Sequence, residues 1–201
     1  MRRKLNKRQK LLRNLALMVA MTLLYLLLTG SQGYLTADQA HAASEMTLNY
    51  GPSQIVQIVS LDNCRYYLGK YDRWFSCHPV YWTVTGWHFG SQNLCDEIDP
   101  NEDINYGWFV SNGQGRIWGV VNNPQIVSVE VELSDGVHTL FLRQDQLYQD
   151  MFLLFYQENS LGEEIGSHME SSDWEGAITD YAVKAVRGYD RDGKLVYTQV
   201  R

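Results

Sequence analysis

Apolar and polar positions alternate along much of the chain after residue 50. The clearest case is the segment QIVSVEVELSDGVHTLFL, in which every second residue from Val127 to Leu133 is apolar. This alternation puts the apolar side chains on one face of a strand and leaves the other face in solvent. Asp135 and Gly136 favour a tight turn because they tolerate positive φ angles. The pattern therefore predicts a β-hairpin that returns through residues 137–142.

Other short strands are predicted between turns rich in Gly, Asn and Asp. They span residues 54–61, 65–70, 75–85, 106–111, 116–121 and 151–156. A last hairpin is predicted in AVKAVRGYDRDGKLVYTQV, with its turn from Asp190 to Gly193. Because helices do not alternate with these strands, the pattern favours a mainly β fold, an antiparallel β-sandwich with a barrel as the alternative.

A long apolar run precedes the strands. Residues 14–30, NLALMVAMTLLYLLLTG, carry no charge, and the uncharged stretch continues through Ala37. A helix that crosses a bilayer needs about 20 apolar residues. We therefore expect one N-terminal transmembrane helix ahead of the β-domain.

The charge distribution predicts the orientation of this helix. Residues 1–13 hold seven of the 17 basic residues and none of the 23 acidic ones. By the positive-inside bias, the N-terminus stays in the cytoplasm and the C-terminal part lies outside, at the cell membrane. The rest of the chain has 10 basic and 23 acidic residues, a charge of −13. A part this acidic has no electrostatic reason to bind nucleic acid.

Four parts are expected along the chain. They are a basic cytoplasmic tail (1–13), a transmembrane signal anchor or signal peptide (14–31), a linker or helical stalk (32–50) and an extracytoplasmic β-sandwich domain (51–201). A helical extension is predicted over residues 37–46. The last part is long enough to bury a core of its own.

Cleavage of the apolar segment is the alternative to anchoring. Ala40-His41-Ala42 has the small-x-small pattern of a signal peptidase site, so the protein would be secreted after a cut near Ala42. The spacer between Leu28 and this site is long, and no cysteine before Cys64 could carry a lipid. The anchor is therefore favoured.

The three cysteines lie in the first half of the exported part, where a disulfide can form. They are Cys64, Cys77 and Cys95. A disulfide between Cys64 and Cys77 is favoured, because CRYYLGKYDRWFSC has the pattern of two aromatic-rich strands around a polar turn. The alternative is that all three are buried thiols. No C-x-x-C pair is present, so a zinc site on the cysteines is not expected.

Several segments together resemble a known kind of protein. The order of basic tail, single span, GPSQIV, IVSVEVELSDG, MFLLFY and YDRDGKLVYT resembles uncharacterised single-span, membrane-anchored exported proteins of Gram-positive bacteria. Their outer part is similar to an immunoglobulin-like β-sandwich. The resemblance implies that fold for the outer domain and supplies no catalytic residue.

The acidic segment CDEIDPNEDIN is the first candidate for chemistry. It has Asp or Asn at every second position from Asp99 to Asn105, as calcium loops do. The turn position holds Ile104 instead of glycine and the bidentate position holds Val110 instead of glutamate, which excludes an EF-hand. A looser calcium site on Asp99 and Asp103 is the alternative to a solvated acidic loop, and no other cofactor is expected.

Catalytic motifs are not recognisable in the sequence. The five histidines (41, 78, 88, 138 and 168) are dispersed without H-E-x-x-H or another metal spacing, and no serine lies in a G-x-S-x-G elbow. A pair of carboxylates that hydrolyses glycosides remains an alternative, because such a pair is defined by the distance between its two carboxyl groups in the folded protein. We name no catalytic residue and do not expect an enzyme.

Aromatic residues are concentrated in RYYLGKYDRWFSCHPVYWTVTGWHFG. Exposed tryptophans could bind a sugar or a protein partner, whereas buried ones would fill the core. Trp74, Trp82 and Trp87 are the candidate ligand-binding residues, since they flank predicted turns. The expected function is a binding or interaction module for an envelope protein or glycan. The alternatives are a secreted or anchored hydrolase acting on envelope glycans or peptides, and a structural envelope protein.

Overall fold

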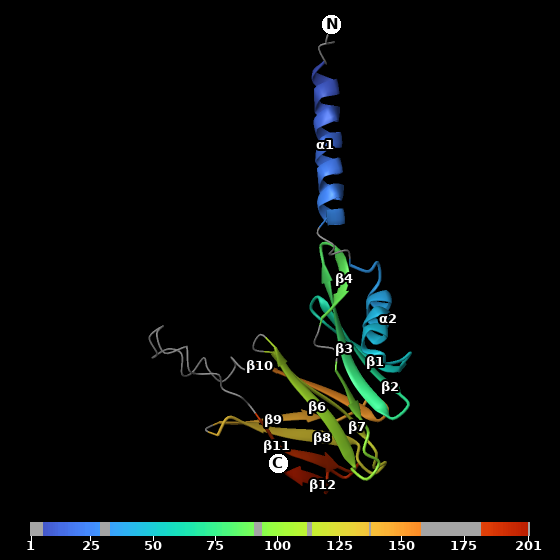
Figure 1. The fold of residues 1–201 in the computed structure, drawn as a ribbon. Helices are drawn as coiled ribbons and strands as arrows, with labels where there is room; N and C mark the ends of the chain where they lie inside the picture. The colour runs from blue at the N-terminus through green and yellow to red at the C-terminus, as the bar shows by residue number, and fades with distance from the viewer. Residues whose placement is uncertain are drawn as a thin grey trace, which may run out of the picture.

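Antiparallel strands contain most of the described residues that follow Leu48, and two helices precede them (Figure 1). The computed structural model describes residues 6–28, 33–90, 94–111, 114–136, 138–157 and 182–200. The helices are α1 (Lys7–Leu28) and α2 (Ala37–Leu48). The strands are β1 (Gln54–Leu61), β2 (Cys64–Tyr71), β3 (Trp74–Thr83), β4 (Gly86–Phe89), β5 (Leu94–Glu97), β6 (Ile104–Ser111), β7 (Gln114–Val121), β8 (Ser128–Ser134), β9 (Thr139–Gln144), β10 (Met151–Gln157), β11 (Ala182–Tyr189) and β12 (Leu195–Val200). The prediction of a mainly β, antiparallel fold is confirmed.

The predicted strands have counterparts in the structure, with differences at their ends. The run predicted over 75–85 is divided, because β3 ends at Thr83 and the chain turns into β4 at Gly86, whose φ is +119°. The sequence pattern does not predict β5, whose segment LCDE shows no alternation. The predicted return strand begins at residue 137, which lies outside the described residues, and its described part is β9.

Three sheets contain the described strands. Sheet A has the order β1-β2-β3-β4, and β5 also pairs with β3. Sheet B has the order β10-β7-β6, and sheet C has the order β12-β11-β8-β9. An immunoglobulin-like sandwich has two sheets, so the strands are divided over one sheet more than expected.

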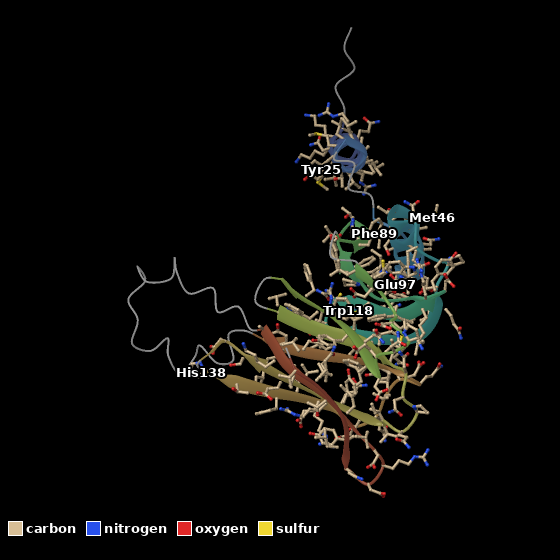
Figure 2. All side chains as sticks on the ribbon, turned by 60° about the horizontal axis from the view of Figure 1, so that its bottom comes forward. Tyr25, Met46, Phe89, Glu97, Trp118 and His138 are labelled. Atoms are coloured by element: carbon tan, nitrogen blue, oxygen red, sulfur yellow. The ribbon has the colours of Figure 1, made fainter. Side chains whose placement is uncertain are left out.

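Sheet B packs on both of its faces. From β10, Phe152 and Leu154 belong to a core shared with sheet C, whereas Met151 and Leu153 belong to a core shared with sheet A. Trp118 of β7 is fully buried in the second core (Figure 2). A strand covered on both faces has no solvated side, which explains the continuous apolar run MFLLFY. Sheet B is therefore the central layer between sheets A and C.

One glycine of β7 is required by the packing of a ring from β10. Gly115 lies opposite Tyr156 in the register of the two strands. A Cβ atom added at Gly115 would lie 2.0 Å from the Tyr156 ring. The ring can therefore lie across the strand only because position 115 has no side chain.

Helix α2 covers the outer face of sheet A. Thr36 caps its first turn by accepting a hydrogen bond from the backbone N–H of Gln39 at 3.2 Å, and Asn49 ends it in the left-handed conformation with φ 53°. Ala37 and Ala40 pack in a core with sheet A. The helix predicted over 37–46 is confirmed. Because the small-x-small motif lies inside α2, a cut near residue 42 would divide this packed helix.

Helix α1 stands apart from the sheets, and its described side chains, including Tyr25, are exposed (Figure 2). Within the part of the chain that the structure describes, no helix combines the length and the apolarity needed to cross a membrane. The segment predicted as an anchor, 14–31, continues past Leu28 into residues 29–31, which lie outside the described residues. Helix α1 also begins at Lys7, within the predicted basic tail.

Candidate functional site

A cluster of polar side chains is buried between α2 and β3. Along α2, the residues that face sheet A recur every three or four positions, and they include His41, Ser44 and Glu45. Across from them, His78 lies on β3 and is 0% exposed. His41 and Glu45 are each 6% exposed. The small side chains of α2 allow the helix to approach the sheet closely, so these polar groups are held away from solvent.

Three of these side chains form a grouping of the kind that holds a metal ion. The ligand atoms of His41, Glu45 and His78 all lie within 4.8 Å of one another. On α2, His41 Nε2 lies 3.2 Å from Glu45 Oε1, one helical turn away. The rings of His41 and His78 have centroids 5.5 Å apart. The cluster therefore presents two imidazoles and a carboxylate toward one another.

Ser44 connects the two elements. Its hydroxyl donates a hydrogen bond to the carbonyl of His41 at 2.8 Å, and the same oxygen lies 3.3 Å from Nδ1 of His78. Because its single proton is already used, the hydroxyl accepts the Nδ1–H of His78. The Nε2 atom of His78 then carries a lone pair, and it is buried without a hydrogen-bond partner.

The loop before β1 orients the carboxylate. Ser53 donates its backbone N–H to Oε1 of Glu45 at 3.0 Å, and its hydroxyl also bonds to that oxygen. The loop passes close to the carboxylate at Gly51, whose φ is +99° and where a Cβ atom would lie 2.8 Å from Oε2 of Glu45. These contacts fix the carboxylate against the sheet.

Tyr67 of β2 supports the ring of His41. The two rings stack with centroids 4.3 Å apart and an angle of 7° between their planes. The Tyr67 hydroxyl donates to Oδ1 of Asp38 at 2.6 Å. The stacking sets the plane of the imidazole, while both of its nitrogens lack a hydrogen bond of good geometry.

Burial determines the protonation of the cluster. Loss of solvent, with the neighbouring His41 and Arg116, lowers the pKa of His78 to about 3. Loss of solvent also lowers the pKa of His41, although Glu45 and Asp38 act in the opposite direction. Both imidazoles are therefore neutral at neutral pH, which is the form that binds metals.

This cluster is not predicted from the sequence. The histidines show no metal spacing, because His41 and His78 are far apart in the chain and only the packing of α2 on β3 brings them together. A signal was present in the predicted helix 37–46, where His41 and Glu45 are four residues apart and therefore on one face.

Of the three candidate tryptophans, the structure brings two together. Trp82 and Trp87 lie opposite each other in the β3–β4 hairpin, with ring centroids 5.6 Å apart. Trp82 is 49% exposed, and the guanidinium of Arg65 lies 4.8 Å from the centroid of the half-buried Trp87 ring. Trp74 lies at the other end of β3, opposite Tyr71. It is half-buried and has no part in this pair.

The hairpin is joined to the segment that follows α1. Gly33 donates its N–H to the carbonyl of Thr85 at 3.0 Å. Tyr34 and Trp87 exchange two backbone hydrogen bonds, of 2.7 and 2.9 Å. In Figure 1 the hairpin points toward the C-terminal end of α1. We call Leu35, Trp82, Val84 and Trp87 the hairpin surface; Leu35 is 87% exposed and Val84 is fully exposed.

The predicted calcium residues lie in the loop between β5 and β6. Oδ1 of Asp99 accepts hydrogen bonds from the backbone and the side chain of Asn101, both at 2.9 Å. Oδ2 of Asp103 accepts a bond from the side chain of Asn123 at 3.0 Å. Amide groups thus bond to both carboxylates, and the metal-type grouping found in the described residues does not include them. A calcium ion at this loop stays a prediction.

The cysteines are free thiols in the structure, which corrects the expected disulfide between Cys64 and Cys77. The β2–β3 hairpin forms as predicted, but its register puts Cys64 opposite Tyr81 and Cys77 opposite Leu68. This offset of four residues corresponds to about 13 Å along a strand. A disulfide needs Cα atoms within about 7 Å.

An open hollow of about 650 Å³ lies at the end of sheet B, and none of the predicted site residues lines it. Its lining includes Asn122 and Asn123 after β7, Asp145 and Asp150 between β9 and β10, and Arg191 from the turn between β11 and β12. Its lining mixes polar and apolar side chains.

Comparison with known proteins gives one positive result. A family described as a domain of unknown function (DUF5044) matches residues 33–200. The match begins at the glycine that bonds to the β3–β4 hairpin, and α1 precedes it. No curated protein and no solved structure matches the chain.

Proposed function

The chain belongs to the DUF5044 family of domains of unknown function, and we propose that it is an extracytoplasmic binding module that works against the outer surface of the cell membrane. In this proposal the segment 14–31 anchors the chain with its N-terminus in the cytoplasm. The hairpin surface binds the lipid headgroup region.

The observation that carries the proposal is the pairing of Gly33 and Tyr34 with the hairpin. Gly33 follows Leu28, the last residue of α1, by five positions. An extended chain gains at most about 3.6 Å per residue, so the hairpin is within about 18 Å of the helix end. If α1 and the residues after it span the bilayer, the hairpin surface has to lie at the lipid–water boundary.

The character of α1 supports its part in the proposal. Its described side chains include exposed leucine, methionine, valine and tyrosine residues, and no sheet covers them. From Leu15 to Tyr25 these side chains carry no charge, and an uncharged apolar stretch suits a lipid environment better than water. The basic residues ahead of it favour an inner N-terminus.

The composition of the hairpin surface supports contact with lipid headgroups. Tryptophan is enriched at membrane interfaces, because its ring is apolar and its N–H still finds a polar partner. Trp82 and Val84 are exposed at the tip, and Arg65 brings a guanidinium beside Trp87. An arginine there can bind a lipid phosphate.

Quenching of tryptophan fluorescence by brominated lipids tests the proposal. The full chain is reconstituted into vesicles of brominated phosphatidylcholine and phosphatidylglycerol. The double variant Trp82→Phe/Trp87→Phe is expected to lose most of the quenching. Trp74→Phe, which changes a tryptophan at the far end of β3, is expected to keep it. Equal quenching in the two variants would exclude the hairpin from the membrane, and a wild-type chain that does not associate with vesicles would exclude the anchor.

A further inference from the structure

We propose that His41, Glu45 and His78 bind one divalent transition-metal ion of the zinc type, and that this ion fastens α2 to β3. The inference does not depend on the location of the chain or on the hairpin surface. It assigns a metal centre to a cluster that the expected binding function does not use.

The ligand atoms of the three residues are close enough together to share one ion. Their mutual separations, all within 4.8 Å, are near those of ligands around one ion with bonds of about 2.0–2.2 Å. His41 and Glu45 come from one face of α2, while His78 comes from β3. Small rotations of these side chains are enough to close the set around an ion.

The hydrogen bond between His78 and Ser44 leaves Nε2 of His78 available to bind a metal ion. Metal-bound histidines commonly donate the N–H of their other nitrogen to an oxygen acceptor, which fixes the tautomer. Ser44 is that acceptor, at 3.3 Å from Nδ1. It leaves the Nε2 lone pair buried and unpartnered, an arrangement that costs free energy unless something binds there. A metal ion satisfies this lone pair without adding a proton.

Neighbouring residues hold the side chains of the other two ligands, His41 and Glu45, in place. Neither nitrogen of His41 makes a hydrogen bond of good geometry, although the ring is only 6% exposed and is held flat against Tyr67. Ser53 holds Oε1 of Glu45 through its N–H and its hydroxyl. Such outer contacts orient ligands toward a metal and raise its affinity.

The chemistry of the donors selects the ion. Two imidazoles and one carboxylate suit zinc and its neighbours in the transition series, whereas calcium and magnesium prefer sets made only of oxygen. The cluster is enclosed between a helix and a sheet, with exposed fractions of 6%, 6% and 0%. Three protein ligands leave the fourth position of a tetrahedral ion to a water molecule. The enclosure of the cluster favours a structural role, because a catalytic ion must also be reached by a substrate.

Metal titration of the purified full chain in detergent tests the inference. After removal of metals with a chelator, Zn²⁺ is expected to bind at one ion per chain and to raise the melting temperature of the β-domain. Co²⁺ in its place is expected to show visible d–d bands without a thiolate charge-transfer band. Unchanged melting of the folded wild type with Zn²⁺ would overturn the proposal, as would a cobalt–thiolate band, which would place the ion on Cys64, Cys77 or Cys95.

Two variants locate the site. Glu45→Gln keeps an oxygen for Ser53 but removes the charge, and it is expected to weaken Zn²⁺ binding at least about tenfold. His138→Ala is the control, since His138 pairs with Asp135 beside β9 and lies far from α2 (Figure 2). Folding of each variant is checked by circular dichroism. Equal Zn²⁺ affinity in folded Glu45→Gln and wild type would refute the assignment.

Discussion

The hydroxyl of Ser44 on α2 accepts a hydrogen bond from His78 on β3, with 3.3 Å between Oγ and Nδ1. Both residues are fully buried, so this bond joins the helix to sheet A in a place that water does not reach. Ser44→Ala removes the acceptor and leaves the Nδ1–H without a partner. We expect a loss of about 1–3 kcal/mol in the free energy of unfolding, measured by urea titration.

Thr47→Ala is the matched control for this change. Thr47 also lies on α2 and also donates its hydroxyl to a carbonyl one turn earlier, but it is exposed. Its replacement is expected to change the free energy of unfolding by less than about 0.5 kcal/mol. Similar losses in the two variants would mean that the bond to His78 contributes nothing specific.

Asp96 on β5 gives the stability a dependence on pH. Its Oδ2 is buried without a hydrogen-bond partner, and burial raises the pKa of its carboxyl group above the ordinary value. Folding therefore favours the protonated form. Its contribution to stability is fully present below the ordinary pKa of an aspartate and is lost as the pH rises through the raised value.

Asp96→Asn is accordingly expected to be more stable than the wild type at neutral pH. The difference should disappear in acid, at about pH 3, where the wild-type carboxyl is protonated as well. Urea titrations at both pH values measure it, and Asp192→Asn, on the exposed turn between β11 and β12, is the control. A difference that is independent of pH would contradict the assignment to Asp96.

Gly115→Ala should destabilise the contact between β7 and β10. The new methyl group would overlap the Tyr156 ring, which lies 2.0 Å from the position of the Cβ atom. Overpacking of this kind costs about 1–3 kcal/mol. In a Tyr156→Ala background the ring is absent, so the same change at Gly115 is expected to cost little. A double-mutant cycle by thermal unfolding measures this coupling, and costs that simply add would contradict it.

Val84→Asp tests the contact of the hairpin with the membrane. A charged side chain is costly in the bilayer, by up to about 3 kcal/mol at its centre and less near the surface. The variant is therefore expected to lift the hairpin and to lower the quenching of Trp82 by brominated lipids. Phe141→Asp, at an exposed position on β9, is expected to leave the quenching unchanged. The opposite order of the two effects would contradict the proposed orientation.

Local patterns were sufficient to predict most strands. The alternation from Val127 to Leu133 corresponds to β8, and the uninterrupted run MFLLFY corresponds to β10. The same run did not reveal that a third sheet covers the other face of β10, because a continuous apolar segment shows burial without showing what provides it. The number of layers depends on contacts between segments that are distant in the chain.

The candidate sites show the same limit. Trp82 and Trp87 are candidate ligand-binding residues because they flank a predicted turn, and a tight hairpin of adjacent strands brings them together. His41 lies on α2 and His78 on β3, with strands β1 and β2 between them in the chain, so their contact depends on the way the helix packs on sheet A. The disulfide prediction was wrong because the hairpin register, which offsets Cys64 from Cys77, cannot be read from the spacing.

The backbone bonds between Tyr34 and Trp87 also determine how a pulling force would enter the domain. A force applied through α1 reaches Gly33 and Tyr34 first, and it loads their bonds to the β3–β4 hairpin of sheet A before it loads α2. These hydrogen bonds would resist the force at the point where the chain enters the domain. Tension on the N-terminal segment would thus be borne by the edge of sheet A, while the core between sheets B and C stays unloaded.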